Sequence, residues 1–122
     1  MSPFSRRVPF YERELLIECY RSALAAVDAR RCVRESLRRR PLDGGWHVVA
    51  IGKAAAAMTQ GAVDVLGPRV AGGRVVVPPE HLPAGFAPPP RHIAVITSSH
   101  PLPDERSLAA GEAIADYVSS LP

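Results

Sequence analysis

Apolar side chains recur at helical spacing through the first forty residues of the chain. After a loose lead-in of about ten residues, one stripe repeats every three or four positions and predicts an amphipathic helix. A shorter helix is expected to follow, with Asp28 as its N-cap and its end near Arg39, before the Pro and Gly residues of 41–45. The stripe of the first helix consists of Leu15, Leu16, Cys19, Tyr20, Ala23, Leu24 and Val27. The inward positions of the second are Cys32, Val33 and Leu37.

Short apolar runs alternate with helical patterns from residue 46 onward. The prolines between residues 78 and 90 exclude regular structure from that loop. Strands that alternate with helices predict a layered, mainly parallel α/β sheet. The expected elements are a buried strand at Trp46–Ile51, a helix at Ala54–Leu66, strands at Arg74–Val77 and His92–Thr97, and a helix from Asp104 or Glu105.

The last two predicted helices each present one apolar face. Small residues in the helix that starts near Ala54 permit close packing on a sheet. Its expected buried positions are Ala57, Met58, Gly61, Ala62 and Val65. Those of the final helix are Leu108, Ile114, Ala115 and Val118.

The composition is that of a globular protein. Hydrophobic residues make up 47% and charged residues 22% of 122 residues, enough for one domain at most. No apolar run approaches the roughly 20 residues that span a bilayer, and the N-terminus lacks a signal-peptide core, so a cytoplasmic protein without membrane contact is expected. Cys19 and Cys32 are too far apart for a redox or zinc pair and are expected to be buried, reduced thiols.

The modest net charge of +3 is unevenly distributed, because arginines cluster near the second helix. Such a cluster can contact nucleic acid or a membrane surface. No aromatic side chains are interleaved with it, which favours a solvated helix face and argues against a nucleic-acid partner. The cluster comprises Arg30, Arg31, Arg34, Arg38, Arg39 and Arg40.

Lys53 is the single lysine among fifteen basic side chains. It follows the strand that ends at Ile51, and Gly52 allows the backbone to turn tightly into the next helix. A lysine ammonium suits a phosphate or carboxylate oxygen, and the helix N-terminus adds unpaired N–H groups and partial positive charge. The pattern favours an anion site over a solvated surface lysine. A Walker phosphate loop is excluded, because its first glycine and its hydroxyl residue are replaced by His47 and Ala54.

A second candidate lies where the third predicted strand turns into the last helix. There, His100 and Asp104 flank a rigid Pro-Leu-Pro segment. Because the carboxyl ends of parallel strands share one edge, both residues are expected near the crevice of Lys53. His100 could donate a hydrogen bond to substrate or carry a proton, and Asp104 could orient it, bind a metal, or simply cap the helix. A dedicated metal site is not expected, and no role is assigned to His47, His81 or His92.

These motifs, in this order and separation, resemble the MOFRL-type glycerate 2-kinases, which use ATP to phosphorylate D-glycerate at its 2-hydroxyl. The matching stretches are Val48–Ala55, Gly73–Pro78 and His100–Ser107, with a helical lead-in at Ala23–Asp28. The resemblance implies the N-terminal portion of a Rossmann-like domain over residues 1–122. Residues 1–45 form its helical lead-in, and residues 46–122 form a β-α-β-loop-β-α unit.

The resemblance also implies chemistry. Lys53 becomes a catalytic residue that offsets charge on the transferring phosphoryl group beside Mg²⁺. Gly52, Lys53, His100 and Asp104 become substrate-binding residues, ATP and Mg²⁺ the cofactors, and D-glycerate the small-molecule partner. Ser99 departs from the glycine usual in relatives, so its side chain is expected to alter the turn or crowd the site.

Family members continue beyond residue 122 into another strand and a Ser/Gly-rich phosphate loop. The chain alone is therefore expected neither to turn over glycerate nor to bind ATP tightly. Its partner is then the remainder of the kinase or a separately encoded polypeptide, and a homo-oligomer is a further possibility. The alternatives are an inactive, free-standing α/β binding or interaction domain, and a sugar-phosphate-binding module.

Overall fold

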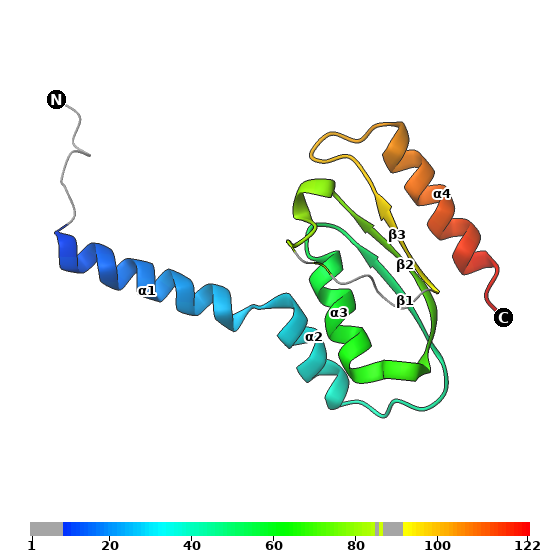
Figure 1. Cartoon of the computed structure of the whole chain (residues 1–122), viewed down its shortest axis with the longest axis horizontal. Coiled ribbons are helices and arrows are strands. Elements are labelled where there is room, and N and C mark those ends of the chain that lie inside the picture. Colours follow the sequence, from blue (N-terminus) through cyan, green and yellow to red (C-terminus); the bar gives the residue numbers. More distant parts are fainter. Residues whose placement is uncertain (1–8, 85, 87–91) are drawn as a thin grey trace.

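The computed structural model describes residues 9–84, 86 and 92–122 (Figure 1). The expected lead-in at 1–8 and Pro88, Pro89 and Pro90 lie outside the described residues. The helices are α1 (Phe10–Ala26), α2 (Ala29–Arg38), α3 (Ala55–Leu66) and α4 (Glu105–Ser119). The strands are β1 (Trp46–Ile51), β2 (Val70–Val77) and β3 (Ile93–Thr97). Short 3₁₀ turns occupy Gly67–Arg69 and Pro79–His81.

The three strands form one parallel sheet in the order β1-β2-β3. Ala50, Val75 and Val95 lie in register across it, and α3 and α4 cover opposite faces. The layered, parallel α/β architecture is thus confirmed. β2 starts at Val70, four residues earlier than expected, because Gly72 and Gly73 pair with His47 and Val48 of β1.

The core lies between β2 and α3. Val75 and Val77, alternate residues on one face of the central strand, are each 0% exposed. Half-buried side chains of α2, Val33 and Leu37, pack against this core as expected. The fully buried cluster consists of Ala55, Ala62, Leu66, Val70, Val75, Val77 and Ile93.

α2 is held against α3 by a close backbone approach and an ion pair. The Asp28 carboxylate accepts the Arg31 N–H at 2.7 Å, which confirms the predicted N-cap of α2. The Arg30 guanidinium donates hydrogen bonds to both carboxylate oxygens of Asp64 on α3, at 2.7 and 2.8 Å, and lowers the pKa of that carboxyl. A Cβ at Gly61 would overlap the Arg30 carbonyl oxygen. The small residue of α3 thus permits close packing on α2 rather than on the sheet.

The buried face of α3 is broader than predicted, because the helix is contacted by both the sheet and α2. Gly61 and Ala62 are buried as expected, and Ala57 and Val65 are half-buried. Met58 was wrongly placed inside, since its side chain is 44% exposed. The buried positions are Ala55, Ala56, Thr59, Gly61, Ala62 and Leu66.

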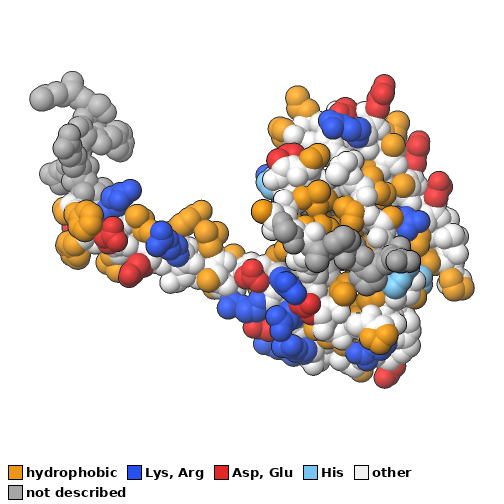
Figure 2. All heavy atoms as spheres, in the orientation of Figure 1, with side chains coloured by type: hydrophobic (Ala, Val, Ile, Leu, Met, Phe, Trp, Pro, Cys, Tyr) orange, Lys and Arg blue, Asp and Glu red, His pale blue; other side chains and the backbone are white. Residues whose placement is uncertain are grey.

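The apolar stripe of α1 is exposed, because α1 extends away from the sheet and its helices (Figure 1). Its hydrophobic side chains are visible along the left of the space-filling view (Figure 2). The expected burial of both thiols is wrong. Cys19 lies on the projecting α1, and Cys32 lies on the outer side of α2, so both are exposed.

Two further burial predictions are wrong at the edge of the sheet and on α4. β1 alternates half-buried and exposed positions, because it is an edge strand and α3 covers only one of its faces. On α4, Leu108, Ala115 and Val118 are exposed, and of the predicted face Ile114 alone is half-buried. The helix instead turns Ala110 and Tyr117 to the sheet.

Tyr117 fixes this orientation of α4. Its hydroxyl shares a hydrogen bond with Nδ1 of His47, and the Arg74 guanidinium stacks 4.2 Å from its ring centroid.

None of the helices in the described ranges is long and apolar enough to cross a membrane.

Substituting Gly61 with Ala tests the α2–α3 contact. The added Cβ meets the Arg30 carbonyl, so Gly61→Ala is expected to lower the free energy of unfolding by about 1–3 kcal/mol. Gly111→Ala is the matched control, since a Cβ at this α4 position meets nothing within 4 Å. It should instead gain about 0.5–1 kcal/mol from helix propensity. Urea unfolding of both variants measures the difference, and equal effects at the two positions would contradict the close approach.

Candidate functional site

The carboxyl ends of all three strands converge at one edge of the sheet. The Gly52 N–H donates to the Val76 carbonyl at 2.9 Å, and the Ser98 N–H donates to the Val77 carbonyl at 3.2 Å. These bonds extend the ladder one residue past β1 and β3. The three loops that follow the strands therefore begin side by side.

The loop after β1 presents Lys53 at the start of α3. Gly52 has a φ of +113°, a conformation that L side chains rarely adopt, so the tight turn requires glycine. Ala54, the N-cap of α3, provides no side-chain cap. Backbone N–H groups of the first turn are thus left without a side-chain partner beside the lysine. The Lys53 side chain is exposed and makes no hydrogen bond or ion pair with any residue that the structure describes.

A cavity of about 210 Å³ joins the first and third loops. Its walls include Gly52, Lys53, Pro78, Ser98, Ser99 and His100. The structure therefore brings Lys53 and His100, which are 47 positions apart in the chain, to one cavity, as the parallel topology predicts. The cavity combines an unpaired ammonium, an uncapped helix N-terminus and an imidazole. Together these groups can bind a small anion and exchange a proton with it.

Asp104 lies beside a neighbouring cavity of about 330 Å³, not in the cavity of Lys53. The two cavities share Ser98, Ser99 and His100. The neighbouring one is also lined by Glu80 and Arg106. His100 thus lies between the cavity of Lys53, which is positively charged, and the neighbouring cavity, which is lined by side chains of both charges. The His100–Pro101 peptide bond is cis.

The Asp104 carboxylate is occupied at the N-terminus of α4. It accepts the Arg106 N–H at 2.8 Å and pairs with the Arg106 guanidinium at 2.9 Å, while Ser107 completes a capping box. The Arg106 guanidinium and the Ser99 hydroxyl lower the pKa of the Asp104 carboxyl to about 2. In this structure Asp104 acts as an N-cap, one of the three roles that the sequence left open.

Sequence reasoning missed two contributors to this edge. His81, in the turn after β2, lies with its ring at 70° to that of His100 and 5.9 Å away between centroids. Ser98 is buried and lines both cavities. The position of His81 four residues beyond Val77 was the available signal.

Within the described ranges, no three His, Cys, Asp or Glu side chains gather as metal ligands would.

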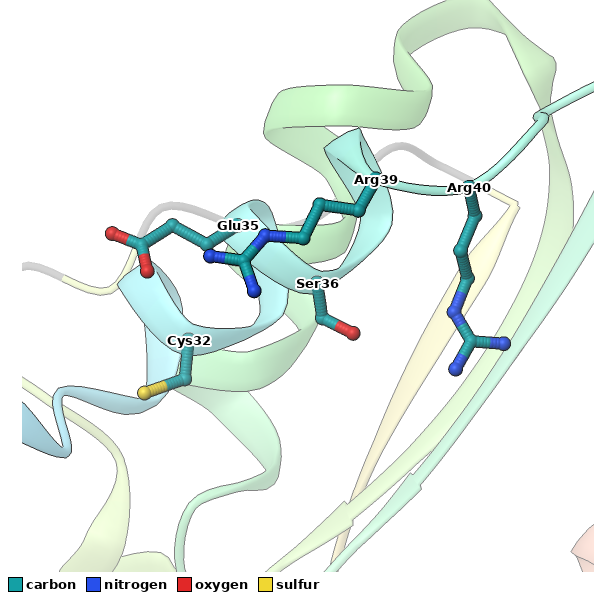
Figure 3. A pocket seen from close by; sticks show the side chains of 5 residues that line it. All are labelled: Cys32, Glu35, Ser36, Arg39 and Arg40. Carbon is teal, nitrogen blue, oxygen red and sulfur yellow. The ribbon is translucent and has the colours of Figure 1, made fainter.

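A separate depression of about 410 Å³ lies on the outer side of α2 (Figure 3). It is lined by Cys32, Glu35, Ser36, Arg39 and Arg40. None of the predicted site residues borders it. Its charges belong to the exposed face of α2, not to the strand ends.

A family model described as a domain of unknown function, DUF4147, matches residues 15–122. A protein of Agrobacterium vitis, provisionally named a hydroxypyruvate reductase, is 38% identical over 109 residues, which cover 89% of this chain and 24% of the relative. The D-glycerate 2-kinase of Thermotoga maritima is 31% identical over 109 residues, which cover 89% of this chain and 25% of the relative.

The crystal structure of a glycerate kinase from Thermotoga maritima is similar with a TM-score of 0.75 and 31% sequence identity. The match covers 93% of this chain and 26% of that protein, and it agrees with the parallel α/β fold described above. The chain thus spans about a quarter of the length of the relatives that it matches.

The ion pair of Asp104 predicts a pH-dependent stability. Its folded-state pKa of about 2 lies below the ordinary value of 3.8, so the ionised carboxylate stabilises the fold above about pH 4 and loses this effect as the pH falls towards 2. Asp104→Asn should therefore be less stable than the original chain at pH 6, and the gap should close near pH 2. The urea midpoints of both proteins at pH 6, 4, 3 and 2 measure this difference in stability. Glu112→Gln, also on α4, is the control, and a gap that does not change with pH would refute this role of Asp104.

Proposed function

The chain belongs to the DUF4147 family, and from this premise we propose that it is the N-terminal part of a MOFRL-type glycerate 2-kinase. The complete enzyme would transfer the γ-phosphate of ATP to D-glycerate. The observation that carries the proposal is the shared cavity of Lys53 and His100 at the strand ends. The name of the 31% identical Thermotoga maritima relative supports the same activity.

The proposed substrate fits the cavity in size and charge. The volume of the cavity, about 210 Å³, is below the roughly 300–1,000 Å³ of typical ligand pockets, which favours a small hydroxy acid as the substrate. The Lys53 ammonium and the first turn of α3 would hold a carboxylate or phosphoryl oxygen. Gly52 allows the backbone to approach that anion closely.

His100 faces the same space and is proposed to bind the substrate through its imidazole. It could donate a hydrogen bond to the substrate hydroxyl or accept its proton. Asp104 is proposed to act in substrate binding from the adjoining cavity, where its carboxylate is already paired with Arg106. Its main contribution would be to hold the loop that carries His100.

The described residues form neither a complete ATP site nor a complete Mg²⁺ site. The cavity of about 210 Å³ is too small for a nucleotide, and no cluster of three metal-ligating side chains lies within residues 9–84, 86 and 92–122. We therefore place both cofactors on parts of the kinase that complete the cleft. The proposal includes a cytoplasmic location.

Sheet topology indicates where this completion would occur. α3 and α4 lie on opposite faces, and among the described residues β1 pairs only with β2. In doubly wound sheets, the strand that follows such an arrangement pairs with the free edge of the first strand, and ligands bind in the crevice at this switch point. Lys53 follows β1 directly and would border that crevice.

The name of the 38% identical relative raises a second activity, the reduction of hydroxypyruvate. A dinucleotide site on this fold normally uses three glycines in the turn after the first strand. Here the turn holds Gly52 followed by Lys53 and two alanines. The geometry therefore favours anion binding by lysine over a pyrophosphate cradle. The binding-domain and sugar-phosphate alternatives share the anion site but require neither ATP nor glycerate.

The kinase proposal is tested by ADP formation with D-glycerate in the complete protein that contains this chain. Lys53→Ala is expected to lower kcat/KM about 100- to 1,000-fold, because the charge on the transferring group loses its fixed counter-charge. Lys53→Arg should recover little, since a planar guanidinium does not replace a compact ammonium. Arg39→Ala removes a positive charge at the C-cap of α2, outside the candidate site, and should leave activity unchanged.

Three results would contradict the proposal. The first is NADH oxidation with hydroxypyruvate in place of ADP formation. The second is full activity of Lys53→Ala. The third is ADP formation by the 122-residue chain alone, which would show that no further polypeptide is needed.

A further inference from the structure

A cluster of three serine hydroxyls closes the loop that carries His100. Ser98 and Ser99 follow β3, and Ser107 lies in the first turn of α4. The Ser99 and Ser107 Oγ atoms are 2.6 Å apart, and the Ser98 hydroxyl donates to the Ser107 Oγ at 3.2 Å. The Asp104 N–H donates to the Ser99 Oγ at 3.1 Å and, at the longer distance of 3.4 Å, to the Ser107 Oγ of the capping box. The cluster therefore ties the start of the loop to its end.

Ser99 is the member of this cluster that spans the loop most directly. Its hydroxyl contacts both Ser107 and the backbone of Asp104, while only four residues, 100–103, separate it from Asp104. Two of those four are prolines, whose φ angles are fixed. Because the segment is short, rich in proline and joined at both ends, the backbone of His100 has few alternative conformations.

The closure determines what His100 can reach. His100 lines the Lys53 cavity on one side and the Glu80–Asp104 cavity on the other, and the His81 ring contacts it edge-on. If the loop opened, the imidazole would no longer be fixed opposite Lys53. The hydroxyl of Ser99 is also half-buried, which makes its hydrogen bonds harder to replace with water.

We propose that Ser99 is a positioning residue that acts through His100. Its hydroxyl holds the loop of residues 99–104 closed, so that the imidazole stays in the Lys53 cavity. This inference rests on the proposed kinase function for its effect on activity. The loop closure itself stands on the hydrogen bonds alone. Ser99 lines both cavities, and its hydroxyl is turned to Ser107 and Asp104, where it shapes the turn, one of the two effects expected from the sequence.

The structural test is hydrogen exchange and imidazole NMR of the complete protein. Ser99→Ala should accelerate exchange of the Asp104 amide about tenfold and shift the His100 ring signals, because the amide loses the shorter of its two hydrogen bonds and keeps only the longer one to Ser107. Ser119→Ala, at the exposed end of α4, is the matched control and should change neither. Unchanged Asp104 exchange and unchanged His100 signals in Ser99→Ala would overturn the proposal.

The functional test is a double-mutant cycle. Ser99→Ala is expected to lower kcat/KM for D-glycerate about tenfold, and to have no further effect when His100 is already Ala. A purely structural role would lower activity in both backgrounds, which would overturn the positioning role. If the complete protein forms no ADP at all, the proposed function fails, and exchange at Asp104 still decides the loop closure.

Discussion

Parallel pairing along β2 is the constraint on which the rest of the structure depends. β2 bonds to a strand on each side, and its inward valines Val75 and Val77 are completely enclosed beneath α3. Since the strands run in the same direction, their carboxyl ends meet at one edge. Lys53, His81 and His100 each follow a different strand, and only this pairing brings them together.

Much of the fold and of the candidate site could be predicted, because both follow from chain topology. The alternation of apolar runs and helical patterns locates β1, α3, β3 and α4 within one or two residues, and Gly52-Lys53 falls at the expected turn. The meeting of Lys53 and His100 follows from parallel strands alone. The contact of His81 with His100 could not be predicted, since it depends on how two irregular loops fold against each other, and the contacts of Ser99 depend on how its own loop closes onto the start of α4.

Burial was harder to predict than the elements themselves. An apolar stripe shows that a helix has an apolar side, but burial also requires a neighbouring element. α1 has its stripe and no covering element in the described part of the chain, so Leu16 and Tyr20 remain exposed. α4 presents Tyr117 to the sheet instead of Leu108, because His47 and Arg74 offer a hydrogen bond and a stacked cation. Cross-sheet partners of this kind leave no periodic signal in the sequence.

The uncovered surface and the candidate site adjoin each other. Ile51, the last residue of β1, is 67% exposed and precedes Gly52 and Lys53 directly. Val49 and Ile51 lie on the α4 face of β1, where Tyr117 of α4 contacts His47 nearer the start of the strand, and both side chains remain exposed. An element that covered these side chains and paired with the free edge of β1 would also wall the crevice beside Lys53. In the proposed kinase, completing the sheet and completing the active site would therefore be the same structural event.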